Sequence, residues 1–331
     1  MKNNTILFTR RQTFQWATAA SVSLAFPAIA QSEWPQGKAI TFVVPFTAGS
    51  GTDVIARTIA EKLGPLLNAQ IVIDNKTGAG GTVGAALVAK APADGYTLLI
   101  HSSGHVVNPA LYPKLSYDTL KDFDGISPLA SLPNVIVVSP NKGYKDVADL
   151  VAKAKAQPGM LNYASAGNGS ATHMNAEKFR IATGVQAQHI PYRGTPEALT
   201  ETASGRIDWF FAPLVSALPL IQSGRLQALA VSTAQRSPLL PLVPSIAEAG
   251  FPSAAYTFWV GLFVTAKTPK PIVQKLHAGV MQVLAMQDVK ERLEKLGAAA
   301  LAMPQDAFEK YLDAETASAA QLVKAAGIKI E

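Results

Sequence analysis

ITFVVPFTAGSGTD, residues 40–53, is an apolar run that enters a glycine-rich turn. The run 40–46 predicts a buried strand, and the turn covers residues 47–52. Asp53 then stands where it can cap a helix, and the apolar residues after it recur near helical spacing. A strand, a tight turn and a helix in this order form the first half of a β-α-β unit.

The same order of elements continues and then recurs about 120 residues later. In the first unit, predicted strands over 70–74 and 96–101 flank a helix from about 82 to 91. In the second unit, we expect a strand over 161–164, a turn over 165–170, a helix over 172–183, a strand over 186–190, a helix over 196–203 and a strand over 207–212. Strands that alternate with helices at this spacing form right-handed parallel units, so the sequence predicts an α/β fold with two similar lobes.

Each lobe presents a glycine-rich turn at the carboxyl ends of its strands, where ligands of open α/β sheets bind. Helix N-termini carry unpaired N–H groups and partial positive charge, so they attract anions. A charge-assisted hydrogen bond to a carboxylate contributes about 1.5–3 kcal/mol. Either turn alone is explained by a tight strand-to-helix connection, but a matched pair favours a cleft that binds a small anion.

Two further apolar segments, 135–138 and 258–264, are candidates for strands that cross between the lobes. The rest of the chain is helical in pattern, with helices that start near Thr268–Pro271, at Asp288 as a cap, and near Gln305. A return of the chain to the first lobe after Trp259 makes that lobe discontinuous. We therefore expect a first lobe of residues 31–132 and 257–331, a second lobe of residues 133–256, and two crossing strands as the hinge.

The first thirty residues have the pattern of a cleaved export signal. Lys2, Arg10 and Arg11 give a basic start, a weakly apolar run covers 14–26, and Ala28-Ile29-Ala30 fits a cleavage site. The alternative is an amphipathic helix or a membrane anchor, although the run is short for a bilayer. We expect a periplasmic protein that begins near Gln31. The segment resembles a twin-arginine signal with its Phe one place late, so Sec and Tat export both stay open.

The composition of the 331-residue chain excludes several chemistries. Because the chain has no Cys, disulfides, iron–sulfur clusters, thiolate zinc sites and Cys nucleophiles are absent. Its 29 basic and 23 acidic residues give a net charge of +6, and cleavage of residues 1–30 leaves 26 basic residues and a net charge of +3. Only 16% of residues are charged, so a surface built to coat nucleic acid is not expected.

Two nucleotide-binding patterns are incomplete around the first turn. The turn resembles a dinucleotide-binding loop, but Val54 stands where the fingerprint needs its third glycine. A phosphate loop requires Lys-Ser or Lys-Thr after its last glycine, whereas this chain has Thr52-Asp53 there. We therefore expect no nucleotide cofactor.

Catalytic and metal-binding patterns are equally incomplete. Ser170, His173 and Asp208 are hydrolase residue types, but no Gly-x-Ser-x-Gly elbow is present. His101 and His105 are four residues apart, yet the segment between them breaks a helix and no paired acids lie nearby. We expect no catalytic residue and no metal. Asp208 lies in an apolar strand, where an acid is either paired or reaches the cleft.

The chain resembles the Bug family of extracytoplasmic solute-binding receptors, the binding components of tripartite tricarboxylate transporters. The resemblance covers the chain from Trp34-Pro35 to the C-terminal helix. It rests on Pro45-Phe46-x-x-Gly49-x-x-x-Asp53, Gly78-Ala79-Gly80-Gly81, Asp94-Gly95-Tyr96-Thr97-Leu98-Leu99, Asn108-Pro109-x-Leu111-Tyr112, Lys121-Asp122-Phe123, Ala166-Gly167-x-Gly169-Ser170-x-x-His173, Pro191-Tyr192-Arg193-Gly194, Leu229-Ala230-Val231 with Arg236, and Trp259-x-Gly261-Leu262. Each motif alone is weak, but their order and spacing together are specific.

The resemblance implies a periplasmic-binding-protein type II fold, a two-lobed Venus flytrap in which each lobe is a mostly parallel sheet flanked by helices. It implies that backbone groups and bridging waters hold a small carboxylate. The ligand-binding residues carried over are Phe46, Thr47, Ala48, Gly49, Ser50, Gly51, Thr52, Ser102, Ser103, Ser165, Ala166, Gly167, Asn168, Gly169, Ser170, Thr172, Tyr192, Arg193, Gly194 and Asp208. The family usually has Pro at the position of Ala48 and Gly at that of Ser50. The hydroxyl of Ser50 either donates to the carboxylate or narrows the approach of the backbone to it.

The function that the resemblance implies is capture of a carboxylate and delivery to the membrane permease of a tripartite transporter, by a monomer that does not bind nucleic acid. Tricarboxylates, dicarboxylates, acidic amino acids and aromatic acids all fit two anion-binding turns. Two alternatives remain at this point: a periplasmic α/β hydrolase that acts on a carboxylate, and a receptor that is read by a signalling sensor.

Overall fold

The computed structural model describes residues 34–328. Every helix and strand of the described part lies in one compact unit that begins at Gly37. The predicted export signal, residues 1–30, lies outside the described residues. Over residues 34–328, no helix combines the length and the apolar character needed to cross a membrane.

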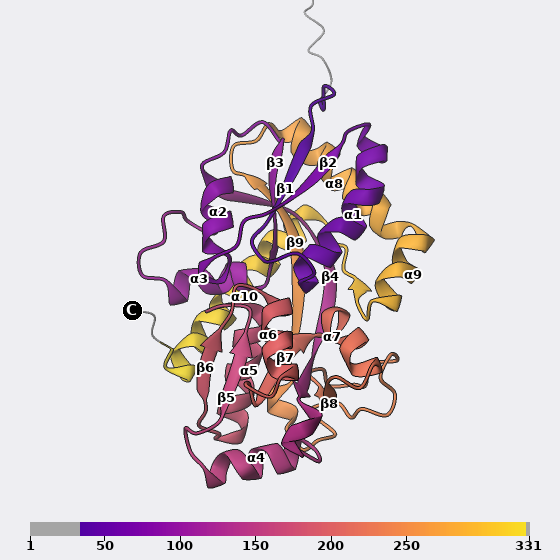
Figure 1. The fold of residues 1–331 in the computed structure, drawn as a ribbon. Coiled ribbons are helices and arrows are strands. Elements are labelled where there is room, and N and C mark those ends of the chain that lie inside the picture. The colour runs from indigo at the N-terminus through magenta and orange to yellow at the C-terminus, as the bar shows by residue number, and fades with distance from the viewer. Residues whose placement is uncertain (1–33, 329–331) are drawn as a thin grey trace, which may run out of the picture. The chain divides into compact units, whose positions relative to one another are not determined.

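The first group of elements follows the predicted β-α-β order (Figure 1). Its elements are β1 (Ile40–Val44), α1 (Gly51–Leu67), β2 (Ile71–Asn75), the short 3-10 turn η1 (Ala79–Gly81), α2 (Thr82–Ala89), β3 (Thr97–Ser102) and α3 (Gly104–Leu111). β1 pairs in parallel with both β2 and β3. Helix α1 continues through Pro65 because Leu63 and Leu67, on either side of it, are both buried in the core.

The second group repeats this order. Its elements are η2 (Pro140–Lys142), α4 (Val147–Ala156), β5 (Asn162–Ser165), α5 (Ala171–Thr183), β6 (Gln188–Pro191), α6 (Thr195–Ala203), β7 (Trp209–Pro213), α7 (Leu214–Gln222), β8 (Gln227–Val231) and η3 (Pro252–Ala254). β5 pairs in parallel with β6 and β7. The α/β fold and its repeated unit are confirmed.

One long strand, β4 (Phe123–Val138), joins the two groups. It pairs antiparallel with β9 (Thr257–Thr265) over residues 123–133, and with β7 and β8 over residues 134–138. The continuous path of strands is β2-β1-β3-β9-β4-β7-β5-β6, with β8 and β10 (Ala299–Ala300) also paired to β4. β9 and β4 thus add antiparallel pairing to the three parallel strands of the first and the second group, respectively. We call the elements around β1–β3 and β9 the first region and those around β5–β8 the second region.

Three helices complete the first region: α8 (Lys270–Ala285), α9 (Gln287–Lys295) and α10 (Gln305–Ala326). Asp288 does not cap α9 as expected, because the helix already begins at Gln287 and the Asp288 carboxylate pairs with Lys62. Helix α10 contacts elements of both regions, since Ala319 and Val323 pack with Leu111 of α3 and Met174 of α5. The exact lobe limits at residues 132/133 and 256/257 stay a prediction.

Aromatic side chains fill the interior of each region. Trp259, Phe263 and Phe308 pack together in the first region, and Phe179 and Trp209 pack edge to face in the second. Complete burial of such a side chain contributes about 1.5–3 kcal/mol. These cores hold the strands rigidly, so the turns at the carboxyl ends of the strands have fixed positions.

Candidate ligand-binding site

The turn before α1 is closed by two reciprocal hydrogen bonds. Ser50 is the N-cap of the helix, and its Oγ accepts from the backbone N–H of Asp53 at 3.4 Å. The Asp53 carboxylate reaches back and accepts from the N–H of Gly49 at 2.9 Å. This resembles a capping box, except that the acidic side chain binds the N–H of Gly49, the residue before the cap, and not that of Ser50. Ser50, and not Asp53 as predicted, therefore caps α1, while Asp53 ties the turn to the helix.

The negative charge of Asp53 is balanced by neighbouring groups of the protein. Burial by itself raises the pKa of this carboxyl, but hydrogen bonds from Arg57, Gly49 and Asn75, together with the charge of Arg57, lower the pKa overall. The Asn75 amide donates at 2.9 Å both to Asp53 and to the carbonyl of Phe46. Asp53 therefore fixes the shape of the turn and is not free to repel an anion.

The turn before α5 has the same construction. Ser170 is the N-cap, and its Oγ accepts from the N–H of His173 at 3.3 Å. His173 takes the place of Asp53, because its Nδ1 accepts from the N–H of Gly169 at 3.1 Å. Both turns also contain one 3.1 Å backbone hydrogen bond, from Ser50 to Thr47 and from Ser170 to Gly167. The two helix starts are thus local copies of each other.

His173 can fill this role only as a neutral ring. Since Nδ1 accepts a hydrogen bond, the ring proton sits on Nε2. Burial, with a further contribution from the charge of Arg180, lowers the pKa of His173 to about 3. The ring is 2% exposed and lies parallel to His189 with 3.9 Å between centroids. The second turn therefore keeps its shape at neutral pH without a charge.

A small cavity of about 20 Å³ lies where the two turns meet. Its lining residues are Phe46, Ser50, Gly51, Thr52, Ser102, Ala166, Ser170, Ala171, Thr172, Thr195, Pro213 and Phe258. The first N–H groups of α1 and α5 have no partner inside their helices. The hydroxyl of Ser102, a residue only 3% exposed, has no hydrogen-bond partner within residues 34–328. The cavity thus gathers donors and places no acidic side chain on its wall.

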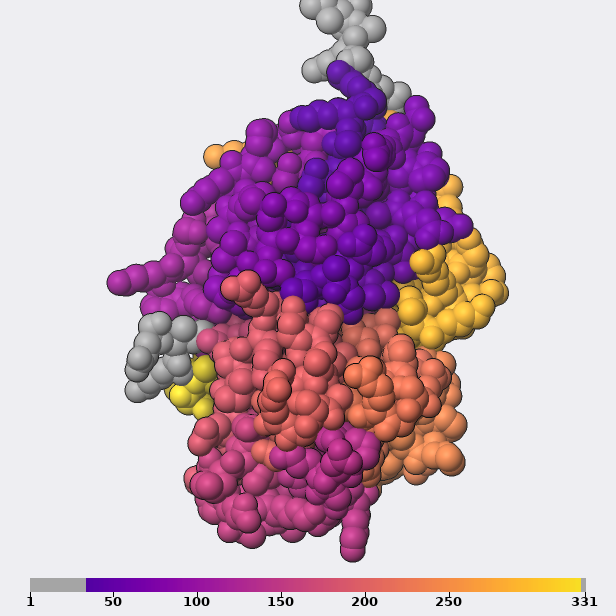
Figure 2. All heavy atoms as spheres, in the orientation of Figure 1, coloured from indigo at the N-terminus to yellow at the C-terminus, as the bar shows by residue number. Residues whose placement is uncertain are grey.

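The two regions touch directly around this cavity. Tyr112 donates to the carbonyl of Asn168 at 3.0 Å, and Ser216 donates to the carbonyl of Gly49 at 3.0 Å. A Cβ atom on Gly80 would lie 1.8 Å from the oxygen of Asn168, so this approach requires glycine. In Figure 2, the indigo atoms of the first region abut the pink atoms of the second. The first and second regions are therefore closed against each other around the cavity.

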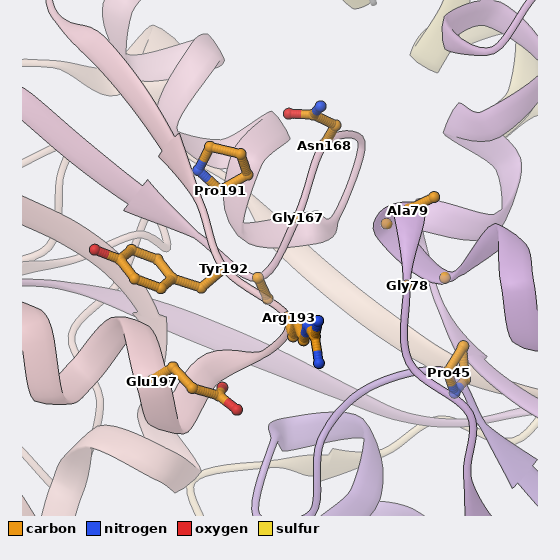
Figure 3. Close-up of a pocket in the computed structure, with 12 residues that line it drawn as sticks. Pro45, Gly78, Ala79, Gly167, Asn168, Pro191, Tyr192, Arg193 and Glu197 are labelled. Carbon is orange, nitrogen blue, oxygen red and sulfur yellow. The ribbon is translucent and has the colours of Figure 1, made fainter.

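A second, larger cavity of about 420 Å³ borders the first. Its lining residues are Pro45, Gly78, Ala79, Gly80, Gly81, Ala166, Gly167, Asn168, Pro191, Tyr192, Arg193 and Glu197 (Figure 3). Ala166 lines both cavities, and Pro45 of the outer cavity is followed by Phe46 of the inner one. We call them the inner and the outer cavity.

The structure brings most of the predicted residues to these two cavities. The predicted residues that line one or both are Phe46, Ser50, Gly51, Thr52, Ser102, Ala166, Gly167, Asn168, Ser170, Thr172, Tyr192 and Arg193. Thr47, Ala48, Gly49, Gly169 and Gly194 belong to the same turns without lining a cavity. Ser165 supports the second turn, since its Oγ lies 2.6 Å from His189 Nε2, and Ser103 lies 3.4 Å from the hydroxyl of Tyr256.

Asp208 is the exception. It lies just before β7, whereas the inner cavity is lined by Pro213 at the carboxyl end of that strand. Its carboxylate accepts from Lys142 at 2.7 Å and from the N–H of Asn162 at 2.8 Å. The sequence left open whether Asp208 is paired or reaches the cleft, and the structure shows that it is paired. Asp208 takes no part in either cavity.

Sequence reasoning missed several lining residues. Pro213 and Phe258 line the inner cavity, and Pro45, the Gly78–Gly81 loop, Pro191 and Glu197 line the outer one. A usable signal was present for two of them. Pro213 ends a strand, and the Gly78–Gly81 loop follows one, at the edge where the other turns gather.

Metal binding finds no support in residues 34–328, where no group of three or more His, Asp or Glu is placed to hold an ion. His101 and His105 do come together, with ring centroids 5.1 Å apart. They are buried against Phe46, Phe123 and Phe263, so they belong to the aromatic interior.

Comparison with known proteins agrees with this geometry. The model of the tripartite tricarboxylate transporter family receptor matches residues 55–328. A protein of Pseudomonas sp. (strain P51), described as UPF0065 protein in tcbD-tcbE intergenic region, is 39% identical over 78% of this chain and 77% of its own length.

Two solved structures are similar over nearly their whole length. R. palustris Rpa4515 with adipate has a TM-score of 0.86 and 35% identity, and covers 89% of this chain and 99% of that one. The periplasmic binding protein BugD has a TM-score of 0.84 and 32% identity, and covers 88% of this chain and 98% of that one. On these matches and on its fold, the chain belongs to the tripartite tricarboxylate transporter receptor family, a family of periplasmic solute-binding receptors.

Proposed function

We propose that this protein captures a small carboxylate between the starts of α1 and α5. The observation that carries the proposal is the pair of matching turns that share one cavity. Unpaired N–H groups of both helices and the hydroxyl of Ser102 supply donors to an anion. The adipate in the similar structure from R. palustris supports a carboxylate ligand.

Capture requires the two regions to move. An inner cavity of about 20 Å³ has room for about one water molecule. A carboxylate must therefore enter while the turns are apart, and the turns close around it at a wider spacing than they have in this structure. A ligand that binds the closed arrangement more tightly than the open one shifts the population toward closure.

We further propose that the closed monomer delivers its ligand from the periplasm to the permease of a tripartite transporter. The family match supports a transporter as the partner. The basic start, the apolar run and Ala28-Ile29-Ala30 support export to the periplasm.

The geometry favours binding over hydrolysis. The Oγ of Ser170 faces the hydroxyl of Thr172 at 3.0 Å and caps α5, while Nδ1 of His173 accepts from a backbone N–H. Asp208 is paired elsewhere with Lys142. The serine therefore has no general base within the hydrogen bonds that it makes, and a triad does not form.

A thermal-shift panel tests the proposal. Succinate, malate, glutarate, adipate, citrate, glutamate and benzoate are each compared with the corresponding neutral amide. A ligand at 100 times its Kd stabilises the protein by about 2.7 kcal/mol, so at least one acid should raise Tm while its amide does not. Stabilisation by no acid, or conversion of an acid into a product in the same sample, would contradict the receptor assignment.

A further inference from the structure

Charge in the outer cavity is confined to two side chains, Arg193 and Glu197. The wall from the first region consists of Pro45 and the Gly78–Gly81 loop, which contribute backbone, a proline ring and one methyl group. All four residues of this loop have positive φ, from 43° to 139°. A Cβ on Gly80 or Gly81 would collide with Asn168 or His101, respectively, so this wall is fixed as uncharged backbone.

The Glu197 carboxylate already has a hydrogen-bond partner in the first region. Its carboxylate accepts the hydroxyl hydrogen of Thr47 at 3.3 Å, across the two regions. It also lies in the first turn of α6, where the helix N-terminus stabilises a negative charge. The acid thus belongs to the contacts that hold the closed arrangement.

Arg193 is not engaged in the same way. Arg193 is exposed, and no ion pair of its guanidinium is found within residues 34–328. Figure 3 shows Arg193 between Tyr192 and the loop that carries Ala79, on the wall of the outer cavity. A guanidinium group presents donors in a planar fork that matches a carboxylate.

We propose that Arg193 binds a second carboxylate of the ligand and thereby selects dicarboxylates over monocarboxylates. The proposal rests on the proposed function, because the first carboxylate is the one held between α1 and α5. Ala166 lines both the inner and the outer cavity, so an acyclic diacid with one carboxylate between the two turns would extend its other end toward the outer cavity. The volume of about 420 Å³ accommodates the remainder of such a ligand and water around it.

Matched ligand pairs separate this role from general electrostatics. Calorimetry measures the Kd of adipate, adipate monomethyl ester and hexanoate, and of succinate, its monomethyl ester and butyrate. The variants are Arg193→Gln, Arg193→Lys and Arg225→Gln. Arg225 is the control because it is exposed, lies in the same region, lines neither cavity and changes the net charge equally.

Arg193→Gln should weaken the diacids by about 10- to 100-fold, the range expected for a charge-assisted hydrogen bond, and weaken the esters and monoacids less than about 3-fold. Arg193→Lys should recover part of the loss, and Arg225→Gln should match the wild type. Three results would overturn this role of Arg193 while the receptor function stands. In Arg193→Gln, they are equal weakening of diacids and monoacids, or unchanged diacid binding. In the wild type, it is a preference for the monoacids. Binding of no acid by the wild type would overturn both proposals.

Discussion

The phenol of Tyr112 in the first region donates its hydrogen to the backbone carbonyl of Asn168 in the second, at 3.0 Å. Burial, with a smaller contribution from Tyr117, raises the pKa of Tyr112 to about 12, so the phenol remains a donor at neutral pH. Asn168 belongs to the turn that leads to Ser170. Closure therefore joins the turn of the second region to a residue that lines neither cavity.

The Tyr112 contact should stabilise the closed arrangement. Tyr112→Phe removes one hydrogen bond, worth about 0.5–1.5 kcal/mol, and keeps the ring. We expect ligand affinity to fall about 2- to 10-fold, mainly through faster dissociation, because the closed complex opens more easily. Stopped-flow fluorescence measures the association and dissociation rates of the ligand. An unchanged dissociation rate would show that this contact has no part in retention.

Gly80 should be required for closure more than for folding. Gly80→Ala places a Cβ 1.8 Å from the oxygen of Asn168, so the turns should no longer meet and ligand affinity should fall by at least about 10-fold. Gly143→Ala is the control, since Gly143 has a similar φ of +65° against +61° and open space around its Cβ position. Both variants should lose similar stability in urea unfolding. Equal ligand affinities in the two would rule out this role.

The two helix caps should serve both stability and binding. Ser50→Ala and Ser170→Ala each remove a cap that contributes about 1 kcal/mol of unfolding free energy, and each should also weaken carboxylate binding. Asp146→Ala removes the cap of α4, which accepts from Asp149 at 2.8 Å and lines neither cavity. It should cost similar stability and leave binding unchanged. Normal binding in both serine variants would mean that the turns do not hold the ligand.

His173 should make the protein less stable as pH falls. Its folded pKa of about 3 is below the ordinary value of 6.5, so the unfolded state takes up a proton that the folded state excludes. The loss begins near pH 6.5 and continues toward pH 3. His173→Asn keeps an acceptor for Gly169 and removes the titration. Its unfolding free energy should fall by about 1.4 kcal/mol less per pH unit than that of the wild type between pH 6 and 4.

Urea unfolding at pH 7, 6, 5 and 4 measures this difference. Burial lowers the pKa of His101 to about 4, and His101 titrates equally in both proteins, so it cancels in the comparison. Burial, with a further contribution from the charge of His173, lowers the pKa of His189 to about 3, so the substitution changes the titration of His189 together with that of His173. Parallel curves for wild type and variant would contradict the account of the second turn.

Local sequence was enough to predict the two turns and the strands and helices next to them, but not α3, α4, α7 or β8. Ser50 and Ser170 each follow a glycine and precede a helix, and these short-range preferences survive in the fold. Which residue of the first turn caps α1 was harder to predict. The choice between Ser50 and Asp53 depends on Arg57 and Asn75, because both of these residues also bind the Asp53 carboxylate.

Contacts between distant segments were not predictable from the sequence. Asp208 directly precedes the apolar strand β7, but whether its carboxylate reaches the cleft depends on which end of β7 faces the cleft and on the position of Lys142. Likewise, nothing local pairs Tyr112 with Asn168, or Thr47 with Glu197. These pairs arise only when the two regions are placed against each other.

A crystal structure of the protein with the tightest-binding acid of the panel tests the central claim most directly. We predict carboxylate oxygens about 3 Å from the N–H groups at the starts of α1 and α5 and from the hydroxyl of Ser102. For a diacid, the second carboxylate should lie beside Arg193. An acid bound away from both turns, with the hydroxyl of Ser102 unpaired, would contradict the account.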